Sequence, residues 1–203
     1  MPIDPRRTAF LNVDMQNRFV EGYPDSAPGG PALLRRINVF AVVCRDASLR
    51  VIHTAHVLRP DGSNAPMGIP EPAKALLTRG SHASMLHKDL IVTKADTVLE
   101  KPRYGAFTGT DLEIVLRAHG IDTVIVGGIA TNVCCDTTAR EAVARDFRLY
   151  FLSDGTATSA IGDVSAEQMQ RATCATLSLP GFGRVLTLDE MTSLIRKAQA
   201  APR

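Results

Sequence analysis

Short apolar runs alternate with longer amphipathic segments along this 203-residue chain. Short apolar runs predict buried strands, and the longer amphipathic segments predict helices. A strand, a helix and a second parallel strand join most readily as a right-handed crossover, so this alternation predicts an α/β fold with a parallel sheet and helices on both faces. In such sheets a ligand binds beyond the carboxyl ends of the strands, where the strand order reverses.

The pattern places each element only approximately. Strands are predicted over Thr8 to Val13, Arg50 to Thr54, a segment between Leu90 and Leu99, Thr123 to Val126, Arg148 to Leu152 and Arg184 to Leu186. Helices are predicted over Pro31 to Ser48, Thr110 to Ala118, Asn132 to Arg145, Ala166 to Leu177 and Asp189 to Gln199. Residues 58 to 72 are rich in Pro and Gly and predict a long loop, which in a compact domain often serves as a lid or binding loop.

Length and composition limit the classes of protein to consider. The chain is long enough for one well-buried core and short for two, so a single domain over 1–203 is expected. A net charge of +2 with scattered Lys and Arg argues against a nucleic-acid partner. We expect no signal peptide and no membrane association, because the N-terminus lacks a long apolar run and no stretch approaches membrane-spanning length. Four cysteines without metal-site or disulfide-scaffold spacing are typical of a cytoplasmic protein.

Cys134 follows a predicted strand and two glycines, at the start of a predicted helix. The unpaired N–H groups and the dipole at a helix start favour a negative charge, which lowers the pKa of a thiol and makes its nucleophilic thiolate more available. A buried cysteine that acts as a small hydrophobe is the commoner case. The spacing alone leaves both interpretations open.

Asp14 and Lys101 follow two other predicted strands. If these strands are parallel to the strand before Cys134, the three side chains emerge at one edge of the sheet. A carboxylate there can take the thiol proton and return it to a leaving amine, and an ammonium keeps the carboxylate ionised. Each residue also has a simpler explanation, because Asp14 could cap a turn and Lys101 could be an ordinary surface lysine. Their joint placement favours a catalytic set.

Three sequence blocks carry a family resemblance: VDMQNRF (13–19), KPRYGAF (101–107) and GGIATNVCCDTTAREA (127–142). They resemble the motifs of the isochorismatase-like cysteine hydrolases, a superfamily that includes nicotinamidases, N-carbamoylsarcosine amidases, ureidoacrylate amidohydrolases, maleamate amidases and biuret hydrolases. The resemblance extends from about residue 8 to about residue 187 with the blocks in the family's order.

The resemblance implies a role for each matched residue. Asp14 would be the general base and acid, Lys101 the charge-stabilising partner and Cys134 the nucleophile. A cis peptide between Ile129 and Ala130 would aim the N–H of Ala130, together with that of Cys134, at the oxyanion. The family also implies a six-stranded parallel sheet in three α/β/α layers, and a homo-oligomer, either a dimer or a tetramer.

Three positions depart from the family's usual pattern. Cys135 stands where Val is common and is interpreted as a packing substitution and the less favoured nucleophile. Gly105 stands where Ser is common, so a hydroxyl near the pocket is expected to be missing. Arg18 stands where nicotinamidases often carry an acidic residue.

The stretch after the second predicted strand bears on metal binding. Nicotinamidases hold a metal there with an Asp-x-His pair, whereas this chain reads His53-Thr54-Ala55-His56. Two positions three apart in a strand face opposite sides. We therefore predict no catalytic metal and no cofactor, with His53 in the core and His56 near substrate. The missing motif also disfavours a nicotinamidase.

Several residues beside the catalytic blocks are candidates to contact a small-molecule substrate. The predicted set is Phe19, His56, Tyr104, Phe107, Thr131 and Asn132. Aromatic residues at such places equally often belong to the core, and the last two residues could instead cap the helix.

The sequence thus favours a cysteine-dependent amidohydrolase of a small linear amide or N-carbamoyl (ureido) compound, acting through a thioester and releasing ammonia. One alternative is isochorismatase-type hydrolysis of a vinyl ether, which uses the Asp and Lys but generally lacks the cysteine. The other is a catalytically silent family member that serves as an oligomeric interaction module.

Overall fold

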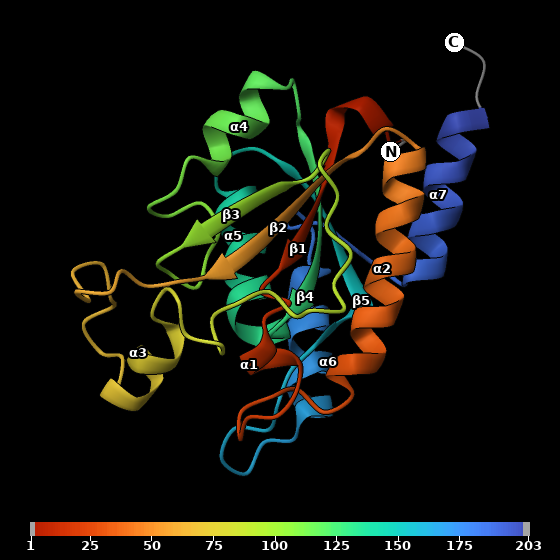
Figure 1. Cartoon of the computed structure of the whole chain (residues 1–203). Coiled ribbons are helices and arrows are strands. Elements are labelled where there is room, and N and C mark those ends of the chain that lie inside the picture. The colour runs from red at the N-terminus through yellow and green to blue at the C-terminus, as the bar shows by residue number, and fades with distance from the viewer. Residues whose placement is uncertain (1–2, 201–203) are drawn as a thin grey trace.

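The computed structural model describes residues 3–200. Its centre is a six-stranded sheet in the order β3-β2-β1-β4-β5-β6, and every neighbouring pair is parallel. The chain begins in the middle of the sheet, builds β2 and β3 on one side, and then crosses β1 to add β4, β5 and β6 on the other (Figure 1). The predicted α/β class and parallel sheet are confirmed.

The elements have the following bounds. The strands are β1 (Thr8–Val13), β2 (Arg50–His56), β3 (Thr97–Lys101), β4 (Thr123–Ile129), β5 (Arg148–Ala157) and β6 (Arg184–Leu186). The helices are η1 (Pro5–Arg7), α1 (Asn17–Val20), α2 (Gly30–Asp46), α3 (Glu71–Leu77), α4 (Leu112–Ala118), η2 (Thr131–Cys135), α5 (Asp136–Val143), α6 (Ala166–Leu177) and α7 (Leu188–Ala200).

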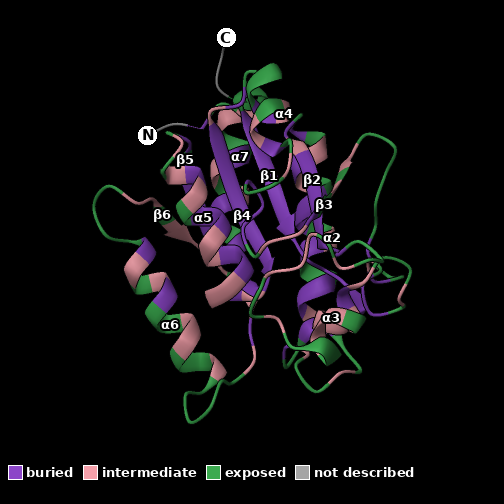
Figure 2. Cartoon of the chain, turned by 90° about the vertical axis from the view of Figure 1, so that its left-hand side faces the viewer, coloured by how far each residue is buried: buried purple, intermediate pink, exposed green. Residues whose placement is uncertain are grey.

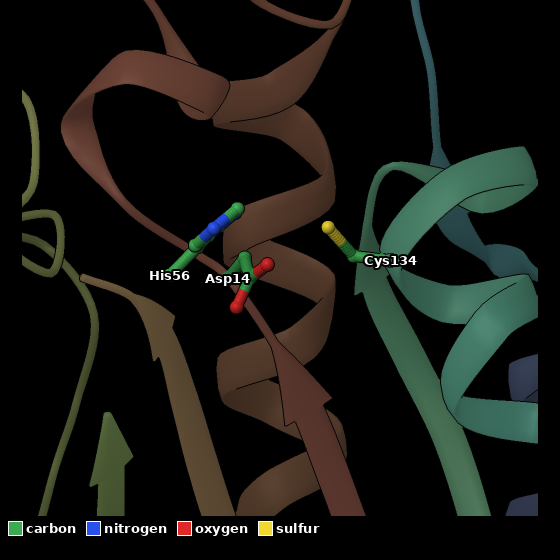
Figure 3. Close-up of side chains that lie close together, drawn as sticks. All are labelled: Asp14, His56 and Cys134. Atoms are coloured by element: carbon green, nitrogen blue, oxygen red, sulfur yellow. The ribbon is translucent and has the colours of Figure 1, made fainter. Parts of the chain in front are cut away.

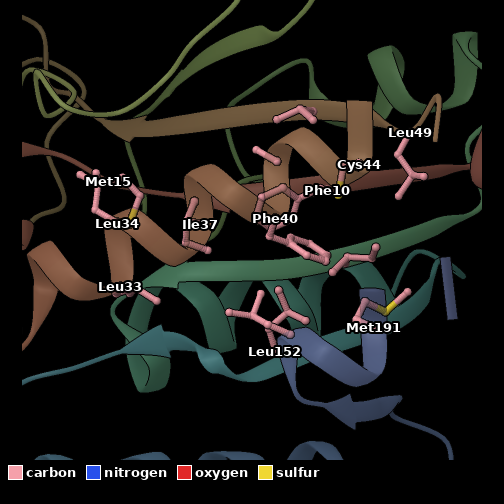
Figure 4. Packing of buried hydrophobic residues seen from close by; sticks show 14 of the residues in the cluster. Phe10, Met15, Leu33, Leu34, Ile37, Phe40, Cys44, Leu49, Leu152 and Met191 are labelled. Atoms are coloured by element: carbon pink, nitrogen blue, oxygen red, sulfur yellow. The ribbon is translucent and has the colours of Figure 1, made fainter. Parts of the chain in front are cut away.

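Two apolar cores separate the sheet from its helices and make three layers. Successive side chains of a strand point to opposite faces, and in β1 Phe10 packs with α2 and α7 while Leu11 packs with α4, α5 and α6. The ring of Phe10 meets Phe40 of α2 edge-on, with 5.0 Å between centroids, and Figure 4 shows α2 lying along this face. Figure 2 shows the consequence: the central strands β1, β2 and β4 are buried, and exposed residues lie on the outer surfaces of the helices.

The turns that begin the helices also follow from local chemistry. Gly29 has φ of +74°, and Pro31 lies in the first turn of α2, where its missing N–H costs no helical hydrogen bond. Ser165 and Gln168 form a reciprocal capping box at the start of α6. Among residues 3–200, no helix has the length and apolar character needed to cross a membrane.

Several element bounds differ from the sequence prediction. The strands β2, β4 and β5 continue beyond their apolar runs, to His56, Ile129 and Ala157. The 58–72 segment is mostly loop as predicted, but a short helix, α3, begins at Glu71. The expected single helix after β4 opens instead with the π-helical turn η2, which contains Cys134 and leads into α5.

Candidate active site

Asp14 follows β1 directly and is fully buried. Its φ of +51° is uncommon for a residue with a side chain. Its backbone N–H donates to the Thr54 carbonyl oxygen at 3.1 Å, and its Oδ1 accepts from the Thr54 hydroxyl at 2.7 Å. Thr54 of β2 therefore fixes both the backbone and one carboxylate oxygen of Asp14, and Oδ2 remains for chemistry.

Lys101 is the last residue of β3, and its side chain has no exposed surface. Its Nζ lies 2.8 Å from Asp14 Oδ2 and donates to the carbonyl oxygens of Arg103 at 2.9 Å and Tyr104 at 2.8 Å. Burial alone lowers the pKa of Lys101, but the Asp14 carboxylate and the Cys134 sulfur outweigh burial and raise it. Lys101 is therefore a fixed positive charge.

Cys134 lies in η2, after β4, and is 5% exposed. Its sulfur lies within 4.8 Å of a carboxylate oxygen of Asp14 and of a ring nitrogen of His56. Figure 3 shows the sulfur pointing toward both side chains. The structure therefore brings Asp14, Lys101 and Cys134 together at one edge of the sheet, as predicted. This group of residues lies near β1 and β4, where the chain connections that follow the two strands pass to opposite faces of the sheet.

The electrostatics of Cys134 differ from the expectation for a helix start. Burial raises the pKa of Cys134 to about 12; Lys101 opposes this change, and the Asp14 carboxylate adds to it. The expected lowering of this pKa is therefore wrong, and the resting group is a neutral thiol. Nucleophilic attack then requires a base that removes the proton, and Asp14 Oδ2 is placed for this role. Oδ2 also lies 2.8 Å from the Lys101 ammonium, so the base and its counter-charge are in contact.

Cys135, the neighbouring thiol, packs in the apolar core below α4 and α5 and is fully buried. Burial raises its pKa well above the ordinary value. It is not among the residues that line the cavity beside Cys134. The peptide bond between Ile129 and Ala130, at the end of β4, is cis.

A cavity of about 230 Å³ opens beside Cys134. Of the six predicted substrate contacts, Phe19, His56 and Tyr104 line it. The remaining lining residues are Arg18, Asp25, Ile69, Pro70, Ala73, Leu77, Ile129, Ala130, Val133, Cys134, Thr158, Ser159 and Ile161. One wall therefore comes from the 58–77 region, which includes α3, and another from the residues after β5.

The other three predicted contacts lie outside the cavity lining. Phe107 is buried against Phe147, with ring centroids 5.6 Å apart, and belongs to the core. The Thr131 hydroxyl donates to Gln170 Oε1 at 2.5 Å, and Asn132 Oδ1 accepts from the Thr158 hydroxyl at 2.6 Å. These two residues join η2 to α6 and to the loop after β5, so their role here is to hold elements together.

Arg18 and Asp25 are charged lining residues that the substrate prediction did not include, and Arg18 forms an ion pair with Asp25. Its guanidinium donates to Asp25 Oδ2 at 2.9 and 2.6 Å and to the Ala73 carbonyl oxygen at 3.1 Å. It therefore ties the 58–77 wall of the cavity to α1. The cue in the sequence was its place in the block after Asp14, where nicotinamidases often differ.

Thr158 and Ser159 line the cavity from the end of β5 and were also omitted. The cue was their polarity just beyond a strand, but the predicted strand stopped at Leu152. Because β5 continues to Ala157, these two residues lie at its carboxyl end and reach the cavity.

Gly105 faces α5 rather than the cavity. A Cβ at this position would come within 2.1 Å of Glu141 Oε2. That carboxylate accepts from the Phe107 backbone N–H at 2.9 Å and from the Thr108 hydroxyl. The expectation of a hydroxyl missing near the pocket is therefore wrong, because Glu141 occupies the space.

Asp14, His56 and Cys134 are the described residues whose ligand atoms could surround a metal ion, and all three types bind zinc. The ammonium of Lys101, 2.8 Å from Asp14 Oδ2, opposes a second positive charge in this position. His53 is separate from this group and is buried between Asn12 and Asp96, as predicted for a core histidine. The charge arrangement favours proton transfer over cation binding.

Comparisons with known proteins agree with this geometry. The isochorismatase domain model matches residues 8–190. Nicotinamidase 3 of Arabidopsis thaliana is 32% identical over 184 residues, covering 90% of this chain and 86% of that protein. The ureidoacrylate amidohydrolase RutB of Caulobacter vibrioides is 32% identical over 178 residues, covering 77% and 79%. The crystal structure of a cysteine hydrolase from Pseudomonas syringae pv. phaseolicola 1448A superimposes with a TM-score of 0.89 at 35% identity, covering 98% and 96%. This chain therefore belongs to the isochorismatase family.

Proposed function

We propose that this protein is a cysteine-dependent amidohydrolase that cleaves the C–N bond of a small linear amide or N-carbamoyl (ureido) compound and releases ammonia. The observation that carries the proposal is the grouping of Cys134, Asp14 and Lys101 beside a cavity of about 230 Å³, the size of site that a small molecule fills. The names of two relatives, a nicotinamidase and a ureidoacrylate amidohydrolase, support amide hydrolysis as the reaction class.

The first half of the reaction forms a thioester. Asp14 Oδ2 takes the proton of the Cys134 thiol as the sulfur attacks the substrate carbonyl carbon. The backbone N–H groups of Ala130 and Cys134 receive the oxyanion of the tetrahedral intermediate. Asp14 then gives its proton to the leaving nitrogen, the C–N bond breaks, and ammonia departs from the acyl-enzyme.

The second half uses the same groups in reverse. Asp14 takes a proton from a water molecule, whose oxygen attacks the thioester carbonyl carbon. The C–S bond breaks, the sulfur recovers a proton from Asp14, and the free acid leaves. The Lys101 ammonium is buried against Oδ2 and held by two backbone carbonyls, so its positive charge lies beside Asp14 through both halves.

Ammonia release over a panel of amides tests the proposal. The panel contains nicotinamide, maleamate, N-carbamoylsarcosine, biuret and ureidoacrylate analogues, and we expect turnover of a linear member. Cys134→Ala should lower kcat by roughly 10³-fold or more, because no other group can form the acyl-enzyme. Cys135→Ala is the matched control and should retain activity, since its thiol lies in the core. Activity on nicotinamide alone that needs a divalent ion would contradict the substrate class.

The vinyl-ether alternative predicts a different outcome for the same variant. Hydrolysis of isochorismate would use Asp14 and Lys101 without a nucleophilic sulfur. If Cys134→Ala retained such an activity and the wild type released no ammonia from any amide, ether hydrolysis would replace the proposed reaction. Absence of both activities would favour the silent interaction module.

A further inference from the structure

His56 is held in one position at the carboxyl end of β2. Its backbone N–H donates to Gln16 Oε1 at 2.7 Å, and its carbonyl accepts from Gln16 Nε2 at 3.1 Å. The ring meets Tyr104 edge-on, with centroids 5.8 Å apart. His56 is 1% exposed, and its ring lines the cavity beside Cys134. The ring orientation is therefore set before any ligand binds.

The surroundings of the ring favour one tautomer. The backbone of Pro102, which has no N–H, offers the ring only a carbonyl oxygen, and this oxygen favours an N–H directed at it. Nε2 is buried and has no hydrogen-bond partner among residues 3–200, which leaves Nδ1 as the nitrogen that carries the proton beside Pro102. Burial, reinforced by Lys101, lowers the pKa of His56 to about 4, which keeps the ring neutral at ordinary pH. Nε2 is thus a lone-pair acceptor.

A buried acceptor without a donor is unfavourable unless a ligand satisfies it. The neighbouring Lys101 is not the donor for Nε2, because its ammonium donates to the carbonyl oxygens of Arg103 and Tyr104. One ring nitrogen of His56 lies within 4.8 Å of the Cys134 sulfur and of an Asp14 carboxylate oxygen (Figure 3). A substrate carbonyl carbon within reach of the sulfur would therefore lie close to the ring. An N–H group of the substrate, close to its reacting carbon, can supply the donor that Nε2 of His56 lacks.

We propose that Nε2 of His56 accepts a hydrogen bond from the leaving –NH₂ group of the substrate and thereby selects amides over the corresponding esters. This inference rests on the proposed function. During attack, one N–H of the leaving nitrogen points to His56, and the nitrogen lone pair turns toward the proton on Asp14. The proton passes from the Cys134 sulfur to Asp14 and then to the leaving nitrogen. His56 gains and loses no proton; it positions the leaving group. An ester places an oxygen lone pair against Nε2 instead, which is repulsive.

The test is the ratio of kcat/KM for an amide to kcat/KM for the methyl ester of the same acid, with the amide taken from the panel above. His56→Phe keeps a ring against Tyr104 but has no acceptor, so we expect amide turnover to fall roughly 10- to 100-fold with little change for the ester. His56→Gln can present Oε1 near the position of Nε2 and should recover most of the ratio. His53→Phe, on the same strand but in the core, should leave the ratio unchanged. The ratio does not depend on how much of each variant folds.

Two results would overturn the inference. Equal losses for amide and ester in His56→Phe would show that the ring contributes only packing. If the wild-type kcat/KM for the amide falls on the acid side of its pH profile and this fall disappears in His56→Gln, His56 itself carries a proton during the reaction. Both outcomes leave the proposed function intact if Cys134→Ala is inactive. Amide hydrolysis that survives in Cys134→Ala would remove the proposed function instead.

Discussion

The ion pair between Asp14 and Lys101 has neither side chain exposed. Opposite charges removed from water stabilise a fold only while both are present, because the loss of one leaves the other buried and uncompensated. The ion pair therefore contributes to the stability of the fold as well as to the proposed chemistry. For variants of Asp14 and Lys101, stability and activity must be measured separately.

Lys101→Met should lower the free energy of unfolding by about 3–5 kcal/mol, because Asp14 is left as a buried carboxylate without its partner. Urea denaturation measures the change. The double variant Asp14→Asn with Lys101→Met should recover part of the loss. The matched surface change is Lys74→Met, which breaks an exposed pair with Glu71 and should cost less than about 1 kcal/mol. Equal losses for the two lysines would contradict a buried pair.

The neutral thiol of Cys134 predicts an unusual labelling result. Because the Asp14 carboxylate contributes to the raised pKa of Cys134, Asp14→Asn leaves Lys101 as the dominant neighbouring charge and should move the thiol pKa downward from about 12. Alkylation of Cys134 by iodoacetamide, followed by mass spectrometry across pH, should therefore begin at lower pH in Asp14→Asn than in the wild type. Amide hydrolysis should be lost in the same variant. A shift to higher pH would mean that the carboxylate favours the thiolate.

At the scale of elements, parallel strands are predicted well where side chains are apolar and poorly where glycines or polar residues continue the pairing. The bounds of β1, α6 and β6 agree with the prediction. β4 passes through Gly127 and Gly128 to Ile129, since backbone pairing does not depend on side-chain polarity. The short helix α3 escaped prediction because Pro and Gly dominate the residues before it.

Gly128 allows β4 to approach β1 closely. Its φ is +121°, and a Cβ there would come within 2.0 Å of the Val13 carbonyl oxygen. Gly128→Ala should therefore destabilise the fold by roughly 3 kcal/mol or more and displace Asp14 and Cys134. Thermal unfolding measures the loss. Gly68→Ala is the control, because no atom would lie within 4 Å of its Cβ, and it should be close to neutral. A harmless Gly128→Ala would mean that the two strands can separate without cost.

At the scale of the whole molecule, the grouping of Asp14, Lys101 and Cys134 could be predicted because these residues lie at the ends of three different strands of one parallel sheet. The cavity could not, because Arg18, Thr158 and the residues of α3 come together only through tertiary packing. The protonation state of Cys134 was also beyond the sequence, since it depends on how completely the thiol is buried.

The two buried histidines of β2 make stability depend on pH. Burial lowers the pKa of both His53 and His56, in the latter to about 4 from an ordinary 6.5. As pH falls below 6.5 the unfolded chain binds protons that the folded chain does not, so the free energy of unfolding should decrease down to about pH 4. His56 alone contributes about 3 kcal/mol to this decrease. Urea titrations at a series of pH values measure it, and His56→Gln should show a smaller slope. An identical slope would mean that His56 is not buried in its neutral form.

Gly105 and Glu141 divide one small volume between the segment after β3 and helix α5. Across evolution the two positions should therefore vary together. A lineage that places serine at 105 should carry a shorter residue at 141, and a glutamate at 141 should accompany glycine at 105.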